Sequence, residues 1–182
     1  MNIAGNLLIS PPSIRGSFWE KTVIFVTEHH SKGTVGLVLN KKSPMTITEF
    51  ALQHNINFDV PGYIHIGGPV NVKAFTMLHT SEWKCSNTLR INDDYSLSSS
   101  GDILNNLAMG NCPRQWRLFV GLAGWTPGQL ENEIKGIPPY NHSQSWLISS
   151  ANLDLVFEKN EQTQWAESIE LAGTEFVQNL LV

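Results

Sequence analysis

The chain has 182 residues, of which 41% are hydrophobic, so a sizeable core can form without disulfide or metal staples. No run of 18 apolar residues occurs, which excludes a membrane-spanning helix, and the start lacks the basic and apolar regions of a secretory signal. We therefore expect a single cytoplasmic domain over residues 1–182, with Cys85 and Cys112 as two reduced thiols.

The net charge of −4 is unevenly distributed along the chain. Residues 1–130 carry ten basic and eight acidic side chains, whereas residues 131–182 carry two and eight. Nucleic-acid-binding domains neutralise phosphates with a basic stripe, and the small basic groups at Lys41-Lys42 and at Arg114 with Arg117 do not form one. We therefore expect no tight binding to duplex DNA.

The first third of the chain is predicted to be rich in strands. Residues 7–9, 22–28 and 34–39 are apolar or β-branched runs, and the turn at His29–Gly33 makes the last two a hairpin. Thr46 and Glu49 have the spacing of a capping box, which predicts a helix from Ile47 to His54.

The middle of the chain alternates short strands with glycine turns. Tyr63–Ile66 is predicted to be a strand that runs into Gly67-Gly68-Pro69-Val70. Ser99 or Ser100 is expected to cap a helix that ends near Met109. Further strands are predicted at Phe75–His79, Thr88–Ile91 and Ser96–Ser98.

The segment Trp116–Gly136 predicts a strand, a tight corner and a capped helix. Leu118–Leu122 is the apolar run, and Ala123-Gly124 is the corner. Thr126 is the expected N-cap, with Pro127 in the first helical position and Gln129 three residues after the cap, and Gly136 ends the helix.

The C-terminal region is expected to add one strand and one long helix. Trp146–Ile148 is the strand, and a helical turn is predicted near Asn152–Phe157. Glu161–Ala172 has an amphipathic pattern, which Gly173 is expected to end. The elements together indicate an α/β protein with α+β character, because the hairpins exclude a purely parallel sheet.

Several segments in order along the chain resemble the YqgE/AlgH family. They are Gly5–Ile9, Glu28-His29, Gly36–Lys41, Gly67–Val70 and Gly124–Leu130, and the last two are the most specific. The resemblance implies a mixed, branched sheet curled into a pseudo-barrel with flanking helices. It also implies a bacterial cytosolic regulatory or binding protein, since one branch of the family is named as a transcriptional regulator of exopolysaccharide synthesis. It supplies no catalytic residues and no cofactor.

Each pattern that suggests chemistry has a structural alternative, which we favour. Glu28, His29 and His30 lack the spacing of a metal site, so hydrogen-bonded histidines at a strand end are expected and no metal ligand is assigned. The glycines before the helix at Gln129 lack a Gly-Lys-Ser/Thr or GxGxxG motif. No GxSxG elbow marks a nucleophile. Trp83, Trp116, Trp125 and Trp146 could line a ligand site, although tryptophan most often packs in a core.

If a ligand site exists, we expect it where the two glycine segments meet at one sheet edge. Strands at 63–66 and 118–122 that run side by side in the same direction would bring Gly67, Gly68 and Gly124 together. Trp125 would then supply an apolar wall and Gln129 a neutral donor and acceptor. Asn40, at the end of the 34–39 strand, is the last candidate.

These observations favour a non-enzymatic binding or regulatory protein without a cofactor, whose partner is a protein or a small ligand. The first alternative is an enzyme or small-ligand binder with an anion pocket at the glycine segments. The second is a direct DNA-binding regulator, which the acidic balance and the absence of a recognition-helix pattern disfavour.

Overall fold

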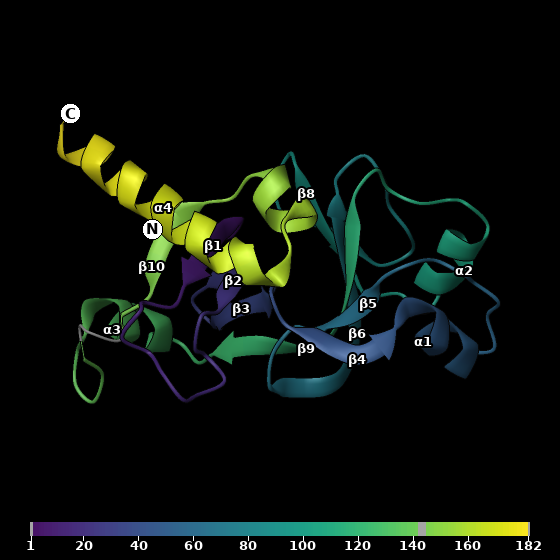
Figure 1. Cartoon of the computed structure of the whole chain (residues 1–182), viewed down its shortest axis with the longest axis horizontal. Helices are drawn as coiled ribbons and strands as arrows, with labels where there is room; N and C mark the ends of the chain where they lie inside the picture. Colours follow the sequence, from purple (N-terminus) through teal and green to yellow (C-terminus); the bar gives the residue numbers. More distant parts are fainter. Residues whose placement is uncertain (1, 142–144, 182) are drawn as a thin grey trace.

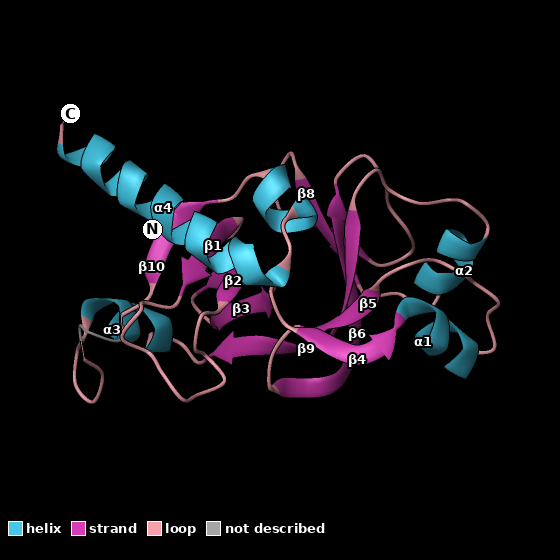
Figure 2. Ribbon diagram, in the orientation of Figure 1, coloured by secondary structure: helices cyan, strands magenta, loops and turns pink. Residues whose placement is uncertain are grey.

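The structure, a computed structural model, describes residues 2–141 and 145–181 (Figure 2). Strands make up much of the described chain, with three α-helices between them and a fourth at the C-terminal end. The strands are β1 (Asn6–Ile9), β2 (Val23–His30), β3 (Gly33–Val38), β4 (Lys42–Thr46), β5 (Tyr63–Ile66), β6 (Val70–Thr80), β7 (Thr88–Arg90), β8 (Tyr95–Ser98), β9 (Trp116–Trp125) and β10 (Leu147–Ser150). The helices are α1 (Ile47–Gln53), α2 (Ile103–Ala108), α3 (Gln129–Lys135) and α4 (Glu161–Leu180), with a π-helical turn η2 (Asp154–Glu158).

The strands of the described chain form one curled, mostly antiparallel sheet in the order β10-β1-β2-β3-β9-β6-β8-β7. The sheet branches at β9, because β5 pairs with β9 in parallel and with β4 in antiparallel. β9 therefore joins the two halves of the molecule, with α3 and α4 beside one half and α1 and α2 beside the other (Figure 1). This curled, branched arrangement forms a half-barrel with flanking helices and confirms the expected fold class.

Three apolar cores pack against the sheet. Leu8, Val26 and Trp125 belong to the core under α3, and Phe25, Leu78 and Phe119 to the core under α4. A third core lies between β6, β9 and the helices α1 and α2. Successive residues of β2 enter different cores, with Val23 and Phe25 in one and Ile24 and Val26 in another, because neighbouring side chains of a strand point to opposite faces.

β9 is longer than the predicted strand, and the corner expected at Gly124 is not there. Gly124 continues the strand and pairs with Val35, while Ala123 pairs with Gly36. The irregular residue is Gly121 instead, which has φ of 71°. A glycine can take that backbone conformation inside a strand, so β9 bends at Gly121 and continues to Trp125.

Helix ends were predicted with mixed success. The capping box of α1 is present: the Thr46 hydroxyl accepts from the Glu49 amide, and the Glu49 carboxylate accepts from the Thr46 amide. By contrast, Asp102 stands at the N-cap position of α2, and the Asp102 side chain makes no capping hydrogen bond. The predicted cap at Ser99 or Ser100 is therefore wrong. The predicted Thr126 cap of α3 is wrong too, because Gly128, with φ of 76°, stands at the N-cap position. Gly136 does end α3 as expected.

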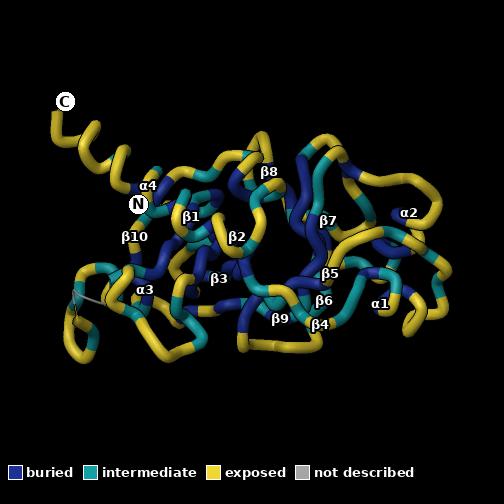
Figure 3. The backbone as a smooth tube through the Cα atoms, viewed as in Figure 1, coloured by how far each residue is buried: buried dark blue, intermediate teal, exposed yellow. Residues whose placement is uncertain are grey.

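The C-terminal helix is much longer than predicted. Asn160 caps α4 by accepting the amides of Gln162 and Thr163, and the helix passes through Gly173 to Leu180. Its last turns project beyond the sheet and are exposed (Figure 3). No helix in the described parts of the chain is long and apolar enough to cross a membrane.

Candidate functional site

A small hollow of about 280 Å³ lies where the end of β9 meets α3 and the segments before β2 and β10. We call it the tryptophan pocket, because three of its walls are indole rings. Its lining consists of Ile14, Ser17, Trp19, Gly124, Trp125, Gln129, Glu133, Tyr140, Asn141 and Trp146.

Glu133 organises the pocket by accepting hydrogen bonds from two indoles. One of its carboxylate oxygens accepts from Trp125 Nε1 at 3.0 Å and from Trp146 Nε1 at 2.8 Å. The other accepts from Gln129 Nε2 at 2.9 Å. Gln129 lies one helical turn before Glu133 on α3, so the two side chains meet on the same face of the helix.

The indole of Trp146 stands nearly at right angles to those of Trp125 and Trp19. The rings of Trp125 and Trp146 have centroids 6.1 Å apart and an angle of 85° between their planes. The corresponding values for Trp19 and Trp146 are 5.8 Å and 86°. Trp125 and Trp146 are each 7% exposed, so these walls are held by packing as well as by Glu133.

The carboxylate of Glu133 has no cationic partner within the described residues. Its three partners are neutral donors, and no lysine, arginine or histidine side chain of the described chain forms a salt bridge with it. A carboxylate has about four acceptor positions, so it can still accept from a ligand. Within the part of the chain that the structure describes, the pocket therefore combines apolar aromatic walls with a carboxylate that has no cationic partner.

The structure brings three of the six predicted site residues into this pocket and leaves three outside. Gly124, Trp125 and Gln129 line it. Gly67 lies between β3 and β9, where its carbonyl accepts from the Val38 amide and its amide donates to the Val120 carbonyl. The predicted site residues outside the pocket are Asn40, Gly67 and Gly68.

Asn40 and Gly68 have structural roles away from the pocket. The Asn40 side chain accepts from the Val23 amide at 2.9 Å and donates to the Lys21 carbonyl at 2.7 Å. A Cβ atom at Gly68 would overlap the backbone of Leu122. The parallel pairing of the 63–66 strand with β9 is confirmed, yet it produces close backbone packing at Gly68 rather than a crevice shared with Gly124.

Sequence reasoning missed most of the pocket. Trp19, Glu133 and Tyr140 were not among the candidates, and Trp146 was only one of four possible wall residues. The Gln129–Glu133 spacing of four was the one local signal for the polar side of the pocket. The other contacts join segments that are distant in the sequence. Trp83 and Trp116, the remaining wall candidates, pack in the core near α2.

His29 of the hairpin is hydrogen-bonded at a strand end, as expected, and His79 of β6 is hydrogen-bonded within the protein as well. His29 Nδ1 is 2.8 Å from the Thr34 hydroxyl. His79 is buried between the Thr80 carbonyl and the Ser98 hydroxyl, at 2.9 and 2.8 Å. Within the described residues, no group of three or more His, Cys, Asp or Glu side chains is placed to hold a metal ion.

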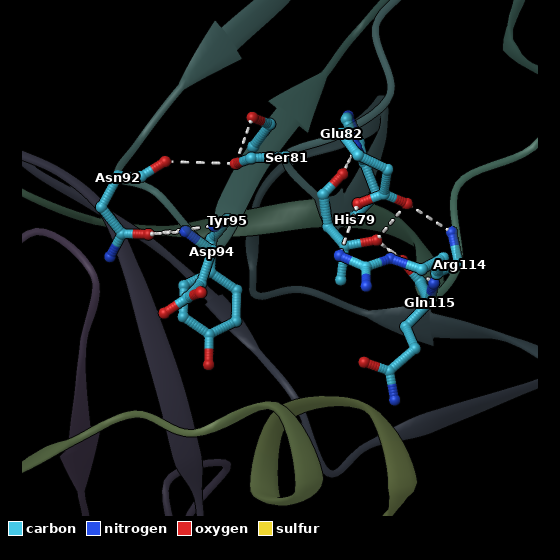
Figure 4. Close-up of polar contacts among 10 residues, drawn as sticks. His79, Ser81, Glu82, Asn92, Asp94, Tyr95, Arg114 and Gln115 are labelled. Carbon is cyan, nitrogen blue, oxygen red and sulfur yellow. Dashed lines mark hydrogen bonds and ion pairs between the residues drawn. The ribbon is translucent and has the colours of Figure 1, made fainter.

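A polar cluster near the end of β6 fastens loops to each other (Figure 4). The Glu82 carboxylate accepts from the Arg114 amide at 2.6 Å and from the Thr80 hydroxyl at 2.8 Å. Burial raises the pKa of Glu82, but these hydrogen bonds outweigh it and lower the pKa to about 2. Glu82 thus connects the end of β6 to the segment before β9, and this bonding accounts for the cluster without a ligand.

Comparison with known proteins places this architecture in a family. The AlgH-like family model matches residues 7–177, which is nearly the whole chain. The chain belongs to the AlgH-like family. A UPF0301 protein of Marinomonas sp. (strain MWYL1) is 36% identical over 172 residues, covering 92% of this chain and 88% of the relative. A UPF0301 protein of Shewanella loihica is 32% identical over 178 residues, covering 94% and 92%.

Two solved structures share the fold of this AlgH-like chain. The solution structure of the AlgH protein from Pseudomonas aeruginosa superimposes with a TM-score of 0.77 at 26% identity, covering 95% of this chain and 90% of that one. The crystal structure of a Corynebacterium diphtheriae protein gives 0.72 at 22% identity, covering 91% and 84%. The family assignment thus supports the resemblance seen in the glycine segments.

Proposed function

We propose that this AlgH-like protein is a non-catalytic, cytosolic regulatory protein that binds a small organic cation in the tryptophan pocket. The observation that carries the proposal is the set of perpendicular indoles around Glu133, a carboxylate without a cationic partner in the described chain. Aromatic faces attract cations through the ring quadrupole, and cages of this kind suit alkylated ammonium groups. The carboxylate adds direct charge complementarity.

The pocket suits a cation better than an anion. Glu133 would repel a phosphate or carboxylate ligand, and Pro127 removes one of the main-chain donors before α3. α3 has only seven residues, so its dipole offers little compensation. Among the described residues, the lining also contains no histidine, lysine or cysteine that could activate Ser17 or act as a nucleophile. These features favour binding over catalysis.

Regulation would then act through ligand and protein contacts rather than through direct DNA contacts. The acidic C-terminal region and the absence of a basic stripe support this view. We expect the purified protein not to retard duplex DNA in a gel at physiological ionic strength. Tight retardation that weakens with added salt would instead favour a DNA-binding regulator.

The ligand class can be tested with choline and its uncharged carbon isostere, 3,3-dimethyl-1-butanol. Both are small enough for a pocket of about 280 Å³, and they differ mainly in charge. We expect choline to change the tryptophan fluorescence and to bind at least about tenfold more tightly than the alcohol, which corresponds to roughly 1.4 kcal/mol. Isothermal titration calorimetry would give both affinities.

Glu133→Gln is the informative variant, because an amide oxygen can still accept from the two indoles while the charge is removed. We expect this variant to keep its fold by circular dichroism and to lose the preference for choline over the alcohol. Equal affinity of the wild-type protein for both compounds, or no detectable binding of choline at millimolar concentration, would refute the proposal.

A further inference from the structure

A second hollow of about 630 Å³ lies between α3, β10 and α4, next to the tryptophan pocket. We call it the α4 groove. Its walls are apolar and include Ile134, Leu147, Ile148, Ile169, Ala172 and Phe176. Trp146 lines both hollows, but the groove has no charged side chain among its described lining residues, whereas the pocket contains Glu133.

The α4 groove continues into an exposed apolar stripe along the end of α4. Ile169, Phe176 and Leu180 follow one another at helical spacing, so they lie on one face of the helix. Ile169 packs against the core, whereas Phe176 is 65% and Leu180 69% exposed. These last turns are exposed because α4 extends beyond the sheet that covers its first half (Figure 3). Apolar side chains gathered in this way mark an interaction surface more often than scattered ones do.

The end of β10 beside the groove is partly covered by Glu175 of α4. The Ser150 amide donates to the Glu175 carboxylate of α4 at 3.0 Å, and the Ser149 hydroxyl donates to the same carboxylate at 2.9 Å. β10 pairs with β1 on its other side. An incoming strand would have to displace Glu175, so the groove favours a partner that inserts side chains.

The acidic residues of the C-terminal region favour a basic partner for the groove. Glu170 and Glu175 are the charged residues of α4 beyond Ile169, and residues 131–182 together carry two basic and eight acidic side chains. A second copy docked here would place this acidic region against itself, and an anionic lipid surface would be repelled as well. A basic partner would instead be attracted to the rim.

We propose that the α4 groove docks an amphipathic helix of a partner protein, with apolar side chains in the groove and lysine or arginine side chains on its rim. The apolar side chains would cover Leu147 and Phe176, and the basic ones would face Glu170. Helix-in-groove recognition uses this combination of apolar anchors and flanking charge. The groove shares Trp146 with the tryptophan pocket, but it binds its partner without a ligand in that pocket.

Three fluorescent 18-residue peptides test the proposal by anisotropy at 0.15 M salt. The first is a helical peptide of leucine and lysine, the second replaces each leucine by serine, and the third replaces each lysine by glutamate. We expect only the first to bind, and we expect ¹H–¹⁵N spectra of the labelled protein to shift at Leu147, Ile148 and residues 169–180. Phe176→Ser should weaken the affinity at least about tenfold.

Met109→Ser is the matched control, because Met109 is 76% exposed at the far end of the molecule and should leave the affinity unchanged. If the serine–lysine peptide bound as tightly as the leucine–lysine peptide, charge alone would account for binding. If the leucine–glutamate peptide bound as tightly, the charge on the rim would not select the partner. Either result overturns the proposal. An unchanged affinity in Phe176→Ser also overturns it. A wild-type dimer in sedimentation that Phe176→Ser dissociates would identify a second copy as the occupant instead.

Discussion

The main-chain amide of Thr126 donates to the side-chain oxygen of Gln129 at 3.0 Å, and the Thr126 hydroxyl donates to the same atom at 3.1 Å. The main-chain amide of Gln129 in turn donates to the main-chain carbonyl of Thr126. The turn before α3 is therefore closed by Gln129 and by main-chain atoms, while the Thr126 hydroxyl accepts no helix amide. Gly128, with φ of 76°, is the residue that allows this entry into the helix.

Gly128→Ala should therefore destabilise the protein by about 1 kcal/mol, because alanine is strained in the left-handed conformation. Nothing lies within 4 Å of a Cβ built at Gly128, so the variant introduces backbone strain without a steric clash. Gly173→Ala is the matched control: its Cβ also meets open space, but it lies inside α4 and should stabilise by about 0.5–1 kcal/mol. Urea denaturation midpoints should move in opposite directions. A shift of both in the same direction would contradict this account.

The two Thr-x-x-Glu/Gln patterns show what local sequence can and cannot predict. At Thr46 and Glu49 the pattern forms a full capping box, as expected. At Thr126 and Gln129 the side-chain half of the box forms, but the Pro127-Gly128 turn moves the helix start two residues later. Similarly, Gly173 was expected to end α4, yet nothing there requires positive φ and the helix continues. Cap residues predict a helix end well only where the backbone conformation between them is also helical.

Gly68→Ala should be far more damaging than Gly124→Ala. A Cβ at Gly68 would overlap the main chain of Leu122, where β5 meets β9, whereas a Cβ at Gly124 would be 3.7 Å from Leu122 Cδ1, an ordinary contact. We expect a loss of at least about 3 kcal/mol for Gly68→Ala and less than about 1 kcal/mol for Gly124→Ala. Thermal unfolding followed by circular dichroism would measure both. Comparable losses would argue against the close approach of β5 and β9 at Gly68.

The fold was more predictable than the site, because strands and helices leave periodic signals and the pocket does not. The hairpin of β2 and β3, the strand β5 and the helix α1 follow from local patterns. The pocket requires Trp19, Glu133 and Trp146 to meet at the end of β9. That meeting depends on how α3 and the loops before β2 and β10 come together, which no spacing in the sequence encodes. Gly124, Trp125 and Gln129 were predicted only because they follow one strand directly.

Glu82 should make the stability depend on acid pH. Although burial raises its pKa, the hydrogen bonds from Arg114 and Thr80 lower the pKa in the folded protein to about 2, below its ordinary value of about 4.5. The stabilisation is therefore fully present above pH 4.5 and is lost as the pH falls toward 2. Glu82→Gln should lower the stability at pH 7 and give a smaller further loss between pH 4.5 and 2. An acid unfolding curve parallel to that of the wild type would contradict this role.

Protonation of His65 should destabilise the protein at a less acidic pH than protonation of Glu82 does. Its side chain is 9% exposed, and neither ring nitrogen has a hydrogen-bond partner within the described residues. The Glu161 carboxylate lies 3.6 Å from Nε2, too far for a hydrogen bond, and it already contacts Lys42 at 2.9 Å. Burial, reinforced by the nearby Arg117 guanidinium and only partly opposed by Glu161, lowers the pKa of His65 to about 4.

The unfolded chain binds a proton at His65 below about pH 6.5, whereas the folded protein binds it only near pH 4, so stability falls as the pH drops through this interval. Between pH 7.5 and pH 5 the expected loss is roughly 2 kcal/mol. His65→Phe, whose ring can pack on Phe119 and cannot be protonated, should remove most of this loss. His30→Gln, an exposed control, should retain it. Urea titrations at the two pH values would compare the three proteins, and an unchanged loss in His65→Phe would show that another group governs the pH dependence.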